Sequence, residues 1–110
     1  MKKKFKEILK LKKMLQDEDI PFTFEKNYLN RDSSDSFEIV IKKNNIQLCS
    51  ACQHSTSYGH EKDLIEIFGG LTKEERNESP MLGYLKAEDV FKRFKWCYTN
   101  NTPKYYKTNS

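Results

Sequence analysis

All four glycines of the 110-residue chain lie between residues 54 and 85, and this clustering constrains the fold more than any other sequence feature. Glycine is used where the backbone needs a positive φ or where it closely approaches another segment. A hydroxyl-rich loop at residues 55–58 leads into Gly59, and apolar residues with helical spacing follow over residues 60–68, up to the Gly69-Gly70 pair. We therefore predict a helix over residues 60–68, ended by glycine just after its last turn.

The segment after the glycine pair carries a second local signal. Thr72 and Glu75 have the spacing of a capping box, in which each side chain accepts a hydrogen bond from the other residue's backbone N–H. This predicts a short helix over residues 73–79. Pro80 then breaks the chain, and the apolar residues 81–85 are expected to form a turn at the edge of the core.

Amphipathic helices are predicted near both ends of the chain. Apolar side chains recur at steps of three and four over residues 3–17, with lysines on the remaining face, and Pro21 follows the end of this pattern. Residues 87–98 repeat the pattern with Val90 and Phe94 on the apolar face. Beyond them, residues 99–110 are polar and are expected to form a flexible tail.

Alternation of apolar and polar residues predicts three strands, at residues 22–25, 37–42 and 46–53. Asn44-Asn45 predicts a tight turn between the last two, because Asn tolerates the left-handed conformation. The element order is then α-β-β-β-α-α-α. We predict an α+β domain over residues 1–98, a three-stranded antiparallel β-meander with helices packed on one face.

Composition excludes several classes of protein. Apolar residues make up 36% of the chain and charged residues 33%, which supports one core but no large enclosed active-site cavity. No apolar run approaches the roughly 18 residues of a membrane span, and no apolar segment follows the N-terminal lysines as in a signal peptide. Three cysteines without such a signal are expected to be thiols in a reducing compartment. We expect a cytoplasmic protein with no membrane partner.

Charge is unevenly distributed along the chain. Residues 1–20 carry seven lysines against four acids, and residues 86–110 carry six basic residues against two acids. Residues 61–85 hold six acids against three bases. A nucleic-acid surface is one interpretation, and the lysine-rich and asparagine-rich composition of an AT-rich genome is the other.

Three segments carry a resemblance to a known group of proteins: residues 57–72 (SYGHEKDLIEIFGGLT), 82–85 (LGYL) and 87–91 (AEDVF). They resemble short proteins encoded by phages and integrative elements of Gram-positive and related bacteria. The pattern of that group is SYG-x-E-x-x-L-(L/I)-E-I-M-G-L-L-T, followed later by (V/L)-G-Y-L-T-A-E-(E/D)-V-F. This chain departs from it at residues 68–70, where Phe-Gly-Gly replaces Met-Gly-Leu, and at Lys86, which replaces a threonine N-cap.

The resemblance implies a context rather than a reaction. Many accessory proteins of mobile elements oppose host defence by binding an effector or by sequestering a signal nucleotide. It therefore implies a non-enzymatic inhibitor of a host defence protein, of the anti-CRISPR type with a Cas effector as partner. Such a protein would act as a monomer or homodimer in the cytoplasm of the host bacterial cell.

We predict a contact surface that combines the loop before Gly59, the acidic residues after it and one aromatic residue of the last helix. An acidic patch can occupy a groove built for nucleic acid. The predicted residues are Ser55, Ser57, Tyr58, Gly59, His60, Glu61, Asp63, Glu66, Glu74, Glu75, Glu78 and Trp96.

Two alternatives remain open from the residues. The first is a nucleotide held at Ser55–Gly59, where a helix N-terminus would bind phosphate, although Glu61 and Asp63 would repel it. The second is weak nucleic-acid binding by the lysines of the first helix, or by Trp96 and the bases and tyrosines around it. The same tail composition equally suits a protein interface.

The Cys49-Ser-Ala-Cys52 segment, with His54 and His60 nearby, has ligand types that zinc accepts. However, residues three apart in a strand point to opposite faces. We therefore predict small buried thiols and no metal or cofactor. No Gly-x-Ser-x-Gly motif, P-loop or paired catalytic carboxylates occur, so we do not expect an enzyme.

Overall fold

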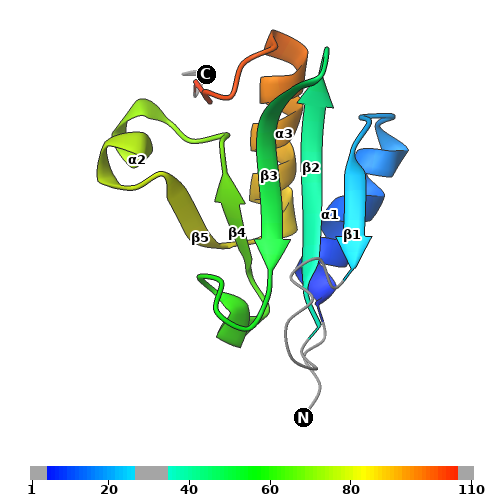
Figure 1. The fold of residues 1–110 in the computed structure, drawn as a ribbon, viewed down its shortest axis with the longest axis vertical. Helices are drawn as coiled ribbons and strands as arrows, with labels where there is room; N and C mark the ends of the chain where they lie inside the picture. Colours follow the sequence, from blue (N-terminus) through cyan, green and yellow to red (C-terminus); the bar gives the residue numbers. More distant parts are fainter. Residues whose placement is uncertain (1–4, 27–34, 107–110) are drawn as a thin grey trace.

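The computed structural model of the chain describes residues 5–26 and 35–106. The elements follow in the order α1 (Lys6–Asp17), β1 (Thr23–Lys26), β2 (Phe37–Lys43), β3 (Ile46–Gln53), the 3₁₀ turn η1 (His60–Lys62), β4 (Ile65–Phe68), α2 (Lys73–Glu78), β5 (Met81–Leu85) and α3 (Ala87–Asn100). The strands form one antiparallel sheet in the order β1-β2-β3-β4-β5, and α1 and α3 pack on one of its faces (Figure 1). The predicted α+β class is confirmed, but the prediction of a three-stranded sheet was wrong, because the described residues form a sheet of five strands.

The central hairpin follows the sequence pattern closely. Phe37, Ile39 and Ile41 of β2 are buried, and the residues between them are more exposed. The turn to β3 has Asn44 at φ 54° and Asn45 at φ 65°, so both asparagines adopt the left-handed conformation that the prediction required. The predicted bounds of β3 are confirmed.

The predicted helix over residues 60–68 is wrong. Asp63 lies at φ 57° and ends a single helical turn, and the chain then continues as β4. Ile65 and Ile67 are β-branched and two residues apart, and both are fully buried, so pairing with β3 outweighed the helical spacing. Gly69 and Gly70, at φ 76° and 71°, reverse the chain after a strand rather than ending a helix.

The apolar turn predicted for residues 81–85 is also wrong. These residues form β5, an edge strand that pairs with β4 through Ile65↔Leu85, Ile67↔Leu82 and Phe68↔Met81. The missing N–H of Pro80 is tolerated because this residue immediately precedes the strand. The chain from β4 to β5 is thus a hairpin with α2 inserted in its connection.

The two long helices bury the faces that the sequence pattern predicted. Ile8, Leu11 and Leu15 of α1 and Val90 and Phe94 of α3 are fully buried. The predicted start of the first helix, at residue 3, lies outside the described residues. Together with the inward residues of the sheet, these side chains form one apolar core.

The chain after α3 returns to the glycine pair. Gly70 N donates to Pro103 O at 2.7 Å, and Tyr105 N donates to Leu71 O at 3.0 Å. The Tyr105 side chain is only 6% exposed. The domain division at residue 98 stays a prediction; α3 itself continues for two residues beyond it.

Candidate functional site

The hydroxyl-rich loop between β3 and η1 is closed by hydrogen bonds of its own. The buried Ser57 hydroxyl accepts a hydrogen bond from His54 N at 3.0 Å and donates one to His54 O at 3.1 Å. His60 N then donates to Ser57 O at 3.1 Å. The Ser57 hydroxyl is therefore used within the turn, while Ser55 is exposed at its tip.

Two tyrosines lie together where this loop meets β5. Tyr58 is 55% exposed and Tyr84 is 50% exposed, and Tyr84 N donates to Tyr58 O at 3.2 Å. The Tyr84 hydroxyl donates to Glu61 Oε2 at 2.6 Å. This bond lowers the pKa of Glu61 and raises that of Tyr84. We call Tyr58, Glu61 and Tyr84 the tyrosine edge.

Glycine is required at two positions that hold the tyrosine edge together. A Cβ at Gly83 would lie 2.1 Å from Tyr58 Cβ, and a Cβ at Gly59 would lie 2.8 Å from Tyr84 N. Both distances are far below van der Waals contact. Gly59 and Gly83 thus allow the loop before η1 and the edge strand β5 to lie in direct contact.

The predicted acidic residues do not form one surface. Glu61 and Asp63 lie at the η1 end of the sheet, whereas Glu74 and Glu75 lie on α2 near the other end (Figure 1). Asp63 accepts hydrogen bonds from Lys6 N at 3.0 Å and from Gln53 Nε2 at 2.9 Å. It therefore serves the N-terminus of α1, where an anion is favourable.

Glu75 belongs to a network that links α2 to α3. Its carboxylate accepts Thr72 N at 2.8 Å, which completes the predicted capping box. It also forms a bidentate ion pair with Arg93, whose two terminal nitrogens donate to the carboxylate oxygens at 2.7 and 2.9 Å. The Arg93 side chain is 5% exposed and donates a further bond to Gly70 O at 3.0 Å. Arg93 lowers the pKa of Glu75 to about 2. The ionised carboxylate therefore stabilises the packing of α2 against α3.

A row of acidic residues crosses the face of the sheet that α1 and α3 leave open. The cross-strand pairs Glu25↔Glu38, Glu38↔Cys52 and Cys52↔Glu66 place one residue from each of four strands side by side. We call these four residues the open row. Partial burial raises the pKa of Glu38, and the neighbouring charge of Glu25 raises it further. Like charges directly opposite each other destabilise a sheet.

Three potential metal ligands meet at one end of the open row. Cys52 lies near the end of β3, His54 follows the last residue of that strand, and Glu66 lies opposite Cys52 on β4. One ligand atom from each of these three residues lies within 4.8 Å of the others. The Cys52 thiol donates to Glu66 Oε1 at 3.4 Å. We call Cys52, His54 and Glu66 the sheet-face cluster.

The geometry of the cysteines agrees with the expectation of opposite faces. Cys49 pairs with Ile41 and lies in the apolar core, where burial raises the pKa of its thiol. Cys52 points to the other face. The sequence pattern grouped Cys52 with Cys49, His54 and His60, and of these the structure brings His54 to Cys52. Glu66 was not expected beside them because a helix was predicted there. A β-branched residue on each side of Glu66, Ile65 and Ile67, was the signal that could have placed it on a strand.

Trp96 lies in an aromatic group rather than on the tyrosine edge. It is half-buried on α3, with ring centroids 6.0 Å from Tyr105 and 5.4 Å from Tyr106. The described lysines of α1 also have contacts. Lys10 pairs with Glu88, and Lys12 lies 4.3 Å above the Phe24 ring. Lys2, Lys3 and Lys4, at the N-terminal end of this lysine-rich segment, lie outside the described residues.

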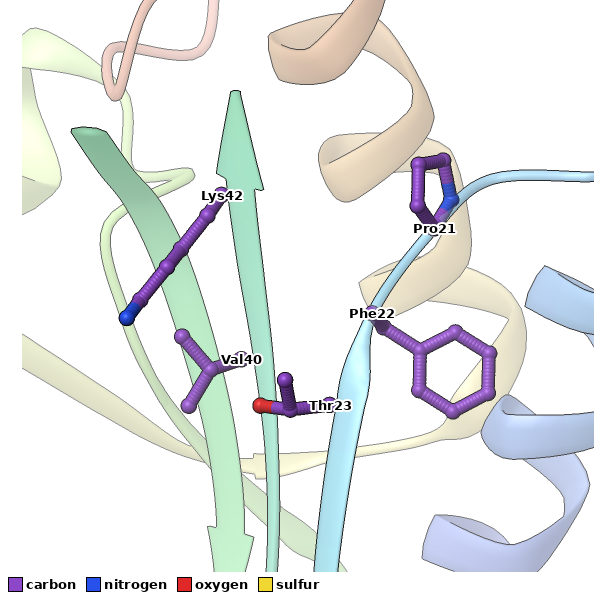
Figure 2. A pocket seen from close by; sticks show the side chains of 5 residues that line it. All are labelled: Pro21, Phe22, Thr23, Val40 and Lys42. Carbon is purple, nitrogen blue, oxygen red and sulfur yellow. The ribbon is translucent and has the colours of Figure 1, made fainter. Parts of the chain in front are cut away.

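A small hollow of about 160 Å³ lies between β1 and β2 (Figure 2). It is lined by Pro21, Phe22, Thr23, Val40 and Lys42. Ligand pockets usually enclose roughly 300–1,000 Å³, so this hollow is too small for a drug-sized ligand.

No protein-family model, curated protein or solved structure matches the chain. Over the part of the chain that the structure describes, no helix has the length and apolarity needed to cross a bilayer.

Proposed function

We propose that this is a non-enzymatic binding protein that acts on another protein through the tyrosine edge. The observation that carries the proposal is the pairing of Tyr58 with Tyr84, each about half exposed and fixed to the other by a backbone hydrogen bond. Tyrosine is enriched among the residues that dominate binding energy at protein interfaces. The backbone at both tyrosines is fixed by this hydrogen bond, and the Tyr84 side chain is also held by Glu61, so ordering this segment on binding costs little conformational entropy.

Three details favour a protein as the partner. The Tyr84 hydroxyl is hydrogen-bonded to Glu61, so the edge presents aromatic surface together with a carboxylate. A carboxylate bonded to a tyrosine suits an arginine-bearing protein surface, because guanidinium bonds carboxylates and stacks on rings. The resemblance to phage and integrative-element proteins supports a host defence protein as the partner class, with a Cas effector as the most specific form.

The nucleotide hypothesis has less support. It depended on a helix N-terminus after Gly59, and the chain forms only the three-residue turn η1 there. Free helical N–H groups and a helix dipole are what such a site needs. The Ser57 hydroxyl, which would face a phosphate, is buried and bonded to His54.

The test combines site-specific photo-crosslinking with matched variants. A photoreactive phenylalanine analogue at position 58 should crosslink one bacterial protein, and the same analogue at position 106 should not. Tyr106 is the control because its exposure, 53%, matches that of Tyr58. The captured protein is then purified and its affinity measured directly.

Expected affinities follow from the role of anchor residues. Tyr58→Ala and Tyr84→Ala should each weaken binding by at least about 30-fold, which corresponds to about 2 kcal/mol. Tyr106→Ala should leave the affinity within about twofold, as expected for a residue outside the interface. Equal crosslinking from positions 58 and 106, or equal affinity of the three variants, would refute the proposal.

A further inference from the structure

We propose that the sheet-face cluster, Cys52, His54 and Glu66, is a binding site for a thiophilic divalent transition metal, with Zn²⁺ as the best-fitting ion. One thiolate, one imidazole and one carboxylate are all ligand types that Zn²⁺ accepts. This site is independent of the tyrosine edge, and neither proposal depends on the other.

The distances suit the ion. Zinc binds sulfur, nitrogen and oxygen at about 2.0–2.3 Å, so tetrahedral ligand atoms lie roughly 3.3–3.8 Å apart. Cys52 Sγ and Glu66 Oε1 are already 3.4 Å apart, and every pair in the cluster is within 4.8 Å. Side-chain rotations that move the ligand atoms by about 1 Å would bring a pair at 4.8 Å to the separation that zinc requires, with the strands left in place.

Two of the three ligands lie on paired strands, Cys52 on β3 and Glu66 on β4. His54 is the first residue after β3, and one of its ring nitrogens lies within 4.8 Å of the other two ligand atoms. Glu66 faces Cys52 through a direct cross-strand pair. His54 is oriented further by Thr56, whose backbone N and Oγ1 lie 3.2 and 3.1 Å from Nδ1. The Thr56 backbone N–H donates to Nδ1, and this contact orients the imidazole ring.

The surroundings favour a cation. Cys52 and Glu66 are each only 5% exposed, although α1 and α3 cover the other face of the sheet (Figure 1). The open row adds Glu38 on the far side of Cys52, and Glu25 beyond it. A divalent ion would offset the repulsion between carboxylates that the sheet otherwise brings together.

Binding exchanges a proton for the metal. The Cys52 S–H bond breaks, the proton passes to solvent, and the thiolate sulfur donates an electron pair to the ion. Three protein ligands leave one coordination position, which water can fill. Affinity should therefore rise with pH while the thiol is being deprotonated.

The experiment uses the untagged full chain, stripped with a chelator and titrated with Co²⁺, Zn²⁺ and Mg²⁺ separately. Co²⁺ should give a near-ultraviolet thiolate-to-metal charge-transfer band that saturates at one ion per chain and disappears on addition of Zn²⁺. Mg²⁺, which prefers oxygen ligands, should neither bind at micromolar concentration nor displace Co²⁺. Saturating Zn²⁺ should also raise the melting temperature of the wild type.

Matched cysteine variants assign the site. Cys52→Ser should abolish the charge-transfer band and weaken Zn²⁺ binding at least tenfold, and His54→Gln and Glu66→Gln should each weaken it tenfold or more. Cys49→Ala removes a thiol from the same strand but from the opposite face, and it should retain the band. Circular dichroism of each variant confirms that it is folded; Glu66→Gln keeps a hydrogen-bond acceptor for Cys52 and is the variant least disturbed by the change.

Three outcomes would overturn the site. One is the absence of a charge-transfer band in the folded wild type at micromolar Co²⁺. A second is a band that survives Cys52→Ser with unchanged Zn²⁺ affinity. Binding of Mg²⁺ as tightly as Zn²⁺ would likewise refute it, because the thiol and imidazole would then contribute nothing.

Discussion

The two faces of the sheet are built from alternate residues of the same strands, yet their chemistry is opposite. On the face covered by α1 and α3, one row of cross-strand pairs is entirely apolar: Phe24, Ile39, Ala51 and Ile67. The adjacent row, one residue later on β1 and β3 and one residue earlier on β2 and β4, faces the other way and is the open row: Glu25, Glu38, Cys52 and Glu66. A shift of one residue in any strand would exchange the two sets.

The two rows differ in what accounts for their side chains. Burial alone explains the apolar row under α1 and α3, since removing apolar area from water stabilises the fold. Burial does not explain the open row, because burying a carboxylate costs free energy unless it has a partner. The Glu66 side chain accepts a hydrogen bond from the weak thiol donor of Cys52, and the metal ion that we propose would supply a positive charge beside this carboxylate.

The largest effect should come from the covered face. Ile39→Ala removes a fully buried side chain at the centre of the sheet, and should lower the free energy of unfolding by about 2–4 kcal/mol. Val40→Ala, at the next residue on the half-buried open face, should lower it by about 1 kcal/mol or less. Urea denaturation measures both. Equal losses would mean that the two faces do not differ in packing.

The next effect concerns the ion pair that joins α2 to α3. Arg93 lowers the pKa of Glu75 to about 2 from an ordinary value of 4.5, so ionised Glu75 stabilises the folded state above pH 4.5. That stabilisation is lost as the pH falls from 4.5 towards 2. Over this window wild type should lose roughly 2–3 kcal/mol more than Glu75→Gln, which has no proton to gain there.

Thermal or urea unfolding at several pH values measures this difference. Other carboxylates titrate in both proteins, so only the difference between wild type and Glu75→Gln is informative. Parallel pH profiles would show that the pair with Arg93 does not stabilise the fold.

The smallest effect belongs to the open row. Glu38→Gln removes one of two like charges that face each other across β1 and β2, so at neutral pH it should raise the free energy of unfolding by about 0.2–0.5 kcal/mol. The gain should shrink at high salt, which screens the repulsion. A loss of stability at low salt would show that Glu38 has a stabilising partner that the cross-strand repulsion does not reveal.

Local signals in the sequence predicted much of this structure. The capping box of Thr72 and Glu75 and the turn at Asn44-Asn45 were both predicted and are both present. Each depends on hydrogen bonds or backbone conformations within a few residues, so the interacting groups can be seen together in the sequence. The predicted opposite orientation of Cys49 and Cys52 holds for the same reason.

The candidate sites and the ion pair between α2 and α3 were harder to predict because their residues meet only through tertiary contacts. Tyr84 comes 26 positions after Tyr58 along the chain, and the two meet because β5 pairs with β4 and the loop packs on Gly83. Arg93 and Glu75, which are 18 residues apart, form their bond only once α2 and α3 have packed together.

By itself, the sequence determined the helices at both ends, the central hairpin and the α+β class, because periodicity and turn residues act over short distances. Only the tertiary structure decided that residues 65–68 and 81–85 are strands. Short apolar segments suit a helix or a strand equally until a partner strand offers hydrogen bonds and buries one face. That choice turned Glu66 toward Cys52 and brought Tyr84 beside Tyr58, and so it created both surfaces on which we propose that this protein acts.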